Sequence, residues 1–208
     1  EAFLSIELRD RPPFGSNESD EFDLIFPNRI QNEAKKKTQL FNYKQIPNAS
    51  NNRSRRILQE FSHTKELTEC CISSYMTTNI NEWRVFMQAP SDAQLDSKWF
   101  YLLVEFPMEY PSNPPLFRFI SIPFHANISD EGRICMNYLD KDYHSSLSVG
   151  YILMCIRSLL GSPNYDDSID AQRTALRQSD PELFDRKVKE SAANGKDKLE
   201  HWLDELGL

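Results

Sequence analysis

Strand-forming hydrophobic residues are concentrated in the middle of the chain. Three runs, residues 83–87, 99–106 and 116–120, carry the aromatic and β-branched side chains that are typical of strands. Only short segments, 89–92 and 107–115, separate one run from the next. Because connections this short favour pairing between successive antiparallel strands, we expect these runs to form an antiparallel meander.

A helix is expected before these strands. Asn51 and Asn52 are both suitable N-caps, and apolar residues follow them at helical spacing. Ile57, Leu58 and Phe61 lie on one face of this expected helix.

Helical spacing returns after the strands. Apolar residues repeat through 149–160, with Ser148 as the expected N-cap and Gly161 placed to end the helix. Another helix is expected to open at 179–182, where a proline stands in the first turn, and the Asn-Gly pair at 194–195 breaks it.

The two ends of the chain differ from this central part. Residues 1–50 are expected to be an extension of unassigned role, and 51–208 to be one folded domain with its C-terminal helices. The first residue is Glu1 rather than Met, which indicates a piece of a longer protein. An apolar stripe near the C-terminus is expected to pack on the core, and docking of a partner is the alternative. The stripe consists of Leu199, Trp202, Leu203 and Leu206.

Composition narrows the class of protein. The 208 residues are 39% hydrophobic and 26% charged, as in globular domains that are soluble in water. The net charge of −7 gives no support to binding of nucleic acid. No apolar run approaches the ~18 residues of a membrane span, so we expect no membrane association.

The four cysteines indicate a reducing compartment. They are Cys70, Cys71, Cys135 and Cys155, and no pair of CxxC motifs is present, so no metal site is expected. Adjacent cysteines do not readily pair with each other. We therefore expect four reduced thiols in a cytoplasmic or nuclear protein.

One of these thiols lies in an irregular stretch between the strands and the helix at 149–160. The stretch contains His125, Asn127, Gly132 and then Ile-Cys, with Cys135 ten positions after the histidine. This spacing resembles the active-site motif of the ubiquitin-conjugating (E2) enzyme family, in which His-Pro-Asn precedes a glycine and Ile-Cys.

The resemblance extends in both directions. Upstream, 106–115 resembles the family's FP-x-x-YP-x-x-PP loop, and Trp83 falls on a tryptophan of its first strands. Downstream, 156–167 resembles its "SLL…PN…D" segment. The likeness covers about residues 53–195 in one register, and four motifs in order at fixed spacing are far more specific than one.

The resemblance implies a fold and a reaction. The fold is α+β and UBC-like: an N-terminal helix, a four-stranded antiparallel meander sheet and C-terminal helices. In the reaction, Cys135 accepts the C-terminus of ubiquitin or a ubiquitin-like protein from an activating (E1) enzyme and passes it to a substrate lysine or to a ligase (E3) cysteine. ATP is consumed by the E1, so no cofactor is expected on this chain.

Chemistry supports these roles but leaves alternatives open. A thiolate is needed, and an ordinary cysteine is only slightly ionised at neutral pH because its pKa is near ~8.5. A buried, inert Cys135 is the alternative. Asn127 is expected to stabilise an oxyanion or to make a local loop hydrogen bond, and His125 to order the loop. The resemblance implies that Asp167 orients or deprotonates the incoming amine. The alternative to this catalytic role is that Asp166 and Asp167 form a solvated turn.

Several positions are expected to contact partners or to depart from the family pattern. Arginines at a helix start oppose the helix dipole, so either partner contact or a solvated surface explains them. They are Arg53, Arg55 and Arg56. Ser112, Ser145 and Ser146 occupy ligase-contact loops where the family often carries Phe and Pro-Ala, which points to a non-standard contact with RING-type ligases. Ala126 replaces the motif proline and removes its fixed backbone angle.

Two other classes of function compete with an active transferase. One is a non-catalytic E2-like module that binds ubiquitin or partner proteins. The other is a cysteine hydrolase that pairs Cys135 with His125 or His144. A charging reaction with E1, ATP and modifier distinguishes all three.

Overall fold

The computed structural model describes residues 52–76, 79–91, 95 and 98–193. The predictions made for residues 1–50 and for the apolar stripe at 199–206 fall outside this part of the chain.

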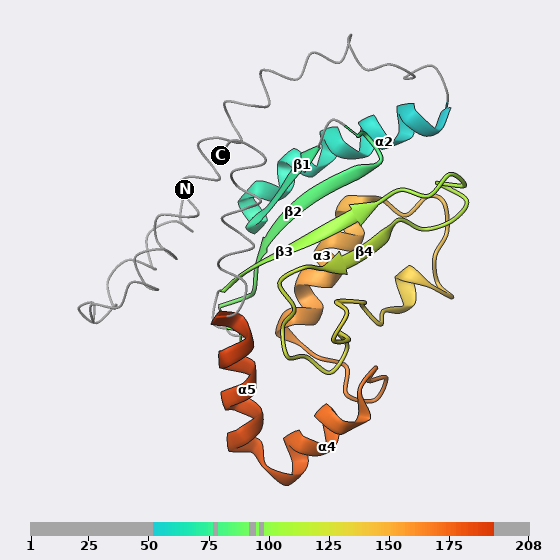
Figure 1. Ribbon diagram of the computed structural model, residues 1–208. Helices are drawn as coiled ribbons and strands as arrows, with labels where there is room; N and C mark the ends of the chain where they lie inside the picture. The colour runs from blue at the N-terminus through green and yellow to red at the C-terminus, as the bar shows by residue number, and fades with distance from the viewer. Residues whose placement is uncertain (1–51, 77–78, 92–94, 96–97, 194–208) are drawn as a thin grey trace, which may run out of the picture.

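A four-stranded sheet forms the centre of the molecule (Figure 1). Its strands pair in the order β1-β2-β3-β4, and every neighbouring pair is antiparallel. The strands are β1 (Ile72–Met76), β2 (Glu82–Gln88), β3 (Trp99–Glu105) and β4 (Leu116–Phe119). The predicted antiparallel meander is confirmed. Its first strand, ISSYM, is the one that the hydrophobic pattern did not locate.

Alternation along β2 sorts its side chains between the two faces of the sheet. Trp83 and Val85 join the hydrophobic core, and both are 0% exposed. Phe86 points to the opposite face, where its ring packs edge-on against Tyr75 at 5.5 Å between centroids and lies 6.5 Å from the ring of Tyr101. The period of two that defines a strand therefore places the large aromatics on both faces.

Helix α2 (Asn52–His63) packs on the core at one end of the sheet (Figure 1). Ile57 is 0% exposed, and Phe61 meets Trp83 edge-on at 5.2 Å. The buried Glu60 forms an ion pair with Arg56 at 2.7 Å and accepts a hydrogen bond from the Val149 amide at 2.9 Å. A 3₁₀ segment, η2 (Thr64–Cys70), leads from α2 to the first strand.

Helix α3 (Val149–Gly161) covers one face of the sheet. The predicted N-cap is confirmed, because Ser148 Oγ accepts a hydrogen bond from the Tyr151 amide at 3.1 Å. The predicted end is confirmed too, since Gly161 is the last helical residue. The buried side chains of α3 are Val149, Ile152, Leu153, Ile156 and Leu160.

Two further helices form a V beyond the sheet, at the end away from α2 (Figure 1). Helix α5 (Pro181–Ala193) begins where the sequence predicts. Helix α4 (Ala171–Ser179) was not predicted, since its sequence AQRTALRQS has no apolar period. Its N-cap was the available signal: the Asp170 carboxylate accepts hydrogen bonds from the Gln172 and Arg173 amides.

The chain turns sharply after β4, at Gly132. This residue has φ +80°, its amide donates to Ser129 O, and its carbonyl accepts from the Phe119 amide, both at 2.9 Å. A Cβ on Gly132 would lie 2.0 Å from Phe119 O. Only glycine provides both the left-handed backbone and the room for this contact, which directs the chain towards Cys135.

Gly132→Ala is therefore expected to lower the free energy of unfolding by about 2 kcal/mol or more, through steric conflict and backbone strain. Gly150→Ala is the matched control, because its new Cβ would meet only Leu67 Cδ1, at an ordinary 3.6 Å. In a helix this change raises stability by up to about 1 kcal/mol. Urea denaturation measures both. Equal shifts in the two variants would contradict the assignment of Gly132 as a required glycine.

Candidate active site

Cys135 lies where the loop after β4 meets the rest of the site. Its side chain is partly exposed and unpaired with any other cysteine, as are the other three thiols. Its backbone amide donates to Asn127 O at 2.9 Å, and the neighbouring Ile134 forms a β-bridge with Ile128. The fully buried, inert position that was the alternative is not observed. The backbone of residues 127–128 thus determines where the sulfur sits.

Asn127 is itself fixed by its side chain. It is 1% exposed, its Nδ2 donates to Asn164 O at 2.7 Å and to Asp167 O at 2.9 Å, and its Oδ1 accepts from the Asn164 amide at 2.8 Å. Both amide hydrogens are used, so this geometry differs from the expectation of an N–H aimed at a developing oxyanion. It matches the alternative, a loop hydrogen bond, and a direct oxyanion contact requires one of these bonds to open.

His125 is buried and bonded through both ring nitrogens. Its Nδ1 accepts from the Asn127 amide at 3.1 Å, which assigns the proton to Nε2 and makes Nε2 the donor to Leu159 O at 2.9 Å. Burial lowers the pKa of His125 to about 4, so the ring is neutral at pH 7. The arrangement supports the loop-ordering role and leaves His125 no free lone pair for the Cys135 thiol, which argues against a hydrolase pair.

The carbonyl of Ala126 is held as well. It accepts from the Ile169 amide and from Ser168 Oγ, both at 3.0 Å. Together with the bonds of Asn127, these contacts attach the loop at 125–128 to the segment 164–169 that follows α3.

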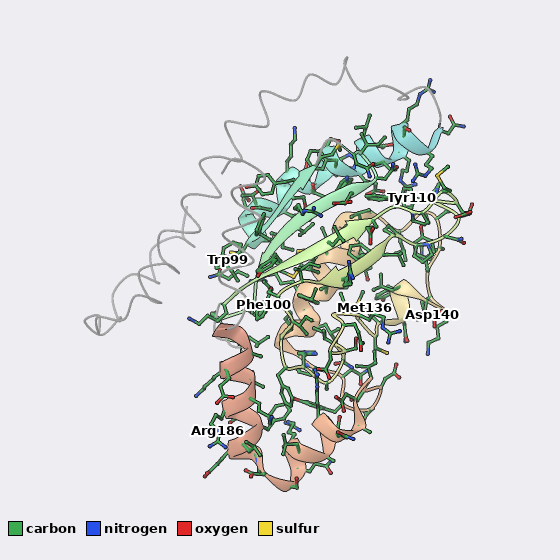
Figure 2. The ribbon with its side chains drawn as sticks, viewed as in Figure 1. Trp99, Phe100, Tyr110, Met136, Asp140 and Arg186 are labelled. Carbon is green, nitrogen blue, oxygen red and sulfur yellow. The ribbon has the colours of Figure 1, made fainter. Side chains whose placement is uncertain are left out.

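Two acidic residues and one lysine act on the Cys135 sulfur through their charges. The pKa of the Cys135 thiol is raised, first by partial burial and then by the negative charge of Asp167, while Asp140 adds to the effect and Lys141 opposes it. Asp167 is exposed and sits near enough for its charge to act on the thiol. Figure 2 labels Met136 and Asp140, which flank η3 (Asn137–Leu139), the 3₁₀ turn that follows Cys135.

The three predicted contact arginines have different surroundings. Arg53 is bonded within the chain: Nε donates to Pro107 O at 2.8 Å, Nη2 to Phe106 O at 2.7 Å and Nη1 to Asn81 Oδ1 at 2.6 Å. Arg56 pairs with Glu60 and donates to Leu147 O at 3.3 Å. Arg55 is exposed. These bonds give Arg53 and Arg56 a structural role. They attach α2 to the loop that follows β3 and to the loop that precedes α3.

The three predicted contact serines, Ser112, Ser145 and Ser146, are exposed. The two loops that carry them are joined, because the Tyr143 hydroxyl donates to Pro111 O at 2.8 Å. Ser146 Oγ lies 2.8 Å from His144 Nδ1. The structure therefore brings both loops and the start of α2 to one side of the molecule.

One contact to the site was missed from sequence. Arg173 on α4 donates to the carbonyls of His125 and Ile128, on either side of Asn127. The residue is 5% exposed, although α4 is otherwise polar. No sequence pattern distinguishes such a buried arginine from the exposed ones of a solvated helix.

Two kinds of feature are absent from the described residues. No three side chains of His, Cys, Asp or Glu gather there as a metal cluster. No helix in those ranges has the length and hydropathy needed to cross a bilayer.

Comparison with known proteins identifies relatives of this chain. The model of the family described as "Ubiquitin-conjugating enzyme" matches residues 56–192. A probable ubiquitin-conjugating enzyme E2 31 of Arabidopsis thaliana is 35% identical over 117 residues, 56% of this chain and 76% of that protein. Ubiquitin-conjugating enzyme E2 2 of Kluyveromyces lactis is 31% identical over 153 residues, 73% and 93% of the two chains.

A solved structure shares the fold. The E2 domain of a Toxoplasma gondii ubiquitin-conjugating enzyme superposes with a TM-score of 0.62 and 26% identity, covering 68% of this chain and 97% of that domain. The expected UBC-like α+β fold is thereby confirmed.

The neutral His125 gives the site a pH dependence. Its ordinary pKa is 6.5 and its folded pKa is about 4, so the unfolded chain binds this proton first as pH falls. Stability is therefore lost between pH 6.5 and 4, by about 3 kcal/mol in all. Urea midpoints from pH 7 to 4 should fall less steeply for His125→Gln than for the parent chain. Parallel curves would show that His125 does not titrate as its burial implies.

Proposed function

This chain belongs to the ubiquitin-conjugating (E2) enzyme family, and we propose that Cys135 carries ubiquitin or a ubiquitin-like protein as a thioester. The observation that supports the proposal most is a partly exposed thiol held by the backbone of Asn127 on the motif loop. A second protein's acyl group needs that access, and the fixed loop supplies the position.

The proposed reaction consists of two acyl transfers without redox change. In the first, the Cys135 thiolate attacks the thioester carbonyl on the E1, a new C–S bond forms and the E1 thiolate leaves. In the second, an amine or a ligase thiolate attacks the same carbonyl and the Cys135 thiolate leaves. ATP drives only the earlier activation on the E1, so this chain needs no cofactor of its own.

Asp167 has opposite effects on the two steps. Its charge raises the pKa of the Cys135 thiol and so reduces the thiolate available for loading. In the second step a carboxylate beside the thioester attracts a lysine ammonium and favours loss of its proton as the amine attacks. We assign Asp167 to delivery rather than to loading.

We assign partner binding to the side of the molecule where the start of α2 meets the two serine-bearing loops. Arg55 is the exposed arginine there, while Arg53 and Arg56 position the loops from within. Because Ser112 is exposed and polar, a RING-type ligase finds no aromatic anchor at this position. E1, a ligase with a different contact and a protein substrate are the proposed partners, in the cytoplasm or nucleus.

A charging assay tests the proposal. Incubated with E1, ATP and ubiquitin or another modifier with its own E1, the parent chain should form a thiol-sensitive adduct. Cys135→Ser should give a thiol-resistant ester that hydroxylamine cleaves. Cys155→Ser, which alters another partly exposed thiol, is the matched control and should charge like the parent.

The outcome also separates the alternatives. A chain that binds modifier but forms no adduct with any E1 is a non-catalytic module. Cleavage of conjugates without ATP indicates a hydrolase. A thiol-sensitive adduct on the Cys135→Ser variant would place the reaction on another cysteine and overturn the proposal.

A further inference from the structure

A buried guanidinium lies against the active-site loop. Nη1 of Arg173 donates to Ile128 O at 2.7 Å and to His125 O at 3.2 Å. These carbonyls lie on either side of Asn127, the residue whose own carbonyl receives the Cys135 amide. One side chain from α4 therefore holds both ends of the short segment that positions the sulfur.

The same guanidinium is held from its other edges. Nε lies 2.9 Å from Asp170 Oδ2, and Nη2 forms an ion pair with Asp130. Its Cζ lies 4.7 Å from the centre of the Phe124 ring. The side chain of Arg173 is 6% exposed, so this is a packed and oriented cation rather than a surface charge that happens to lie nearby.

Arg173 adds to the hydrogen bonds that join the loop to residues 159–169, at a place where the chain lacks one constraint of the family motif. Ala126 stands where the family motif has proline, so its backbone angle is not fixed by a ring. A pocket of about 260 Å³ borders His125 and Ala126 on one side of the loop. Among the described residues, no acceptor pairs with the Ala126 amide, which means that a proline there would break no hydrogen bond.

We propose that Arg173 is a positioning residue that fixes the 125–128 loop in place of the motif proline. It acts on the reaction through Asn127 and the Cys135 backbone and touches no reacting atom. Its effect on the loop follows from the structure alone, whereas its effect on acyl transfer rests on the function proposed above.

Three variants of the 208-residue chain test the assignment. Arg173→Met removes the donors and keeps the length of the side chain. Arg186→Met is the matched control, because Arg186 is an exposed arginine on α5 (labelled in Figure 2). The double variant Arg173→Met with Ala126→Pro restores the ring constraint without restoring the cation.

Two readouts are compared. Hydrogen exchange of the peptide spanning 124–135 reports the loop without any enzymatic step. Discharge of the preformed thioester to free lysine, followed in a single turnover after E1 is quenched, reports its consequence. Thermal unfolding of each variant provides the measure of global stability.

For Arg173→Met we expect faster exchange in 124–135 and lysine discharge slowed by about tenfold to a hundredfold, since small misplacements of reacting groups have effects of this size. Arg186→Met should match the parent in both. Adding Ala126→Pro should restore most of the exchange protection and most of the rate, although the cation is still absent.

The proposal is overturned if Arg173→Met behaves as Arg186→Met does, or if the proline restores neither the exchange protection nor the rate, which is the result for a purely structural arginine. If Arg173→Met does not fold, Arg173→Lys and Asp130→Asn decide in its place. Both weaken the contact in a folded chain, and unchanged exchange in both overturns the proposal. If the parent chain does not charge, the proposed function is lost. Hydrogen exchange in 124–135, and its restoration by Ala126→Pro, still test whether Arg173 fixes the loop.

Discussion

The site depends on hydrogen bonds between the 125–128 loop and the segment from the end of α3 to α4. Asn127 binds the backbone of Asn164 and Asp167, and His125 binds Leu159 O. Irregular backbone that is withdrawn from water has to satisfy its polar groups. Here the side chain of Asn127, the carbonyl of Ala126 and Nε2 of His125 are all bonded to residues 159–169. Because the Cys135 amide binds Asn127 O, the sulfur takes its position from this same set of bonds.

The surroundings of the Cys135 thiol are compatible with the acyl carrier proposed above. The raised pKa of the Cys135 thiol disfavours thiolate at rest, both through burial and through Asp167. A resting thiol is protected from alkylation and oxidation, because the thiolate is the reactive form. In the proposed thioester the sulfur would carry no charge, so Asp140 and Asp167 would carry no such cost and would attract the ammonium group of an acceptor lysine.

How much of this was predictable differs between sheet and site. Three strands and the limits of α3 followed from local sequence pattern. Ser148 caps the start of α3, and Gly161 ends it. β1 was not located because its apolar side chains, at the first, fourth and fifth of its five residues, do not alternate as in a regular strand, although it pairs along its length with β2. Local sequence does not encode the long-range pairing that makes such a segment a strand.

For the site, the motif singled out the loop that holds His125, Asn127 and Cys135, and the geometry then gave the contacts of each side chain. Asn127 donates both amide hydrogens to backbone carbonyls, which composition did not indicate. Arg53 was predicted to contact partners, and the structure shows its guanidinium bonded to three groups of this chain. Arg173 had no sequence signal, because its acceptors lie more than forty positions earlier in the chain.

The proposed function requires that one sulfur, that of Cys135, carries the modifier. The most direct measurement is the intact mass of a chain in which Cys70, Cys71 and Cys155 are replaced by serine, after incubation with E1, ATP and ubiquitin. We predict a mass increase of one ubiquitin that disappears on treatment with thiol. No increase with any modifier and its E1, or an increase that survives thiol, would contradict the account.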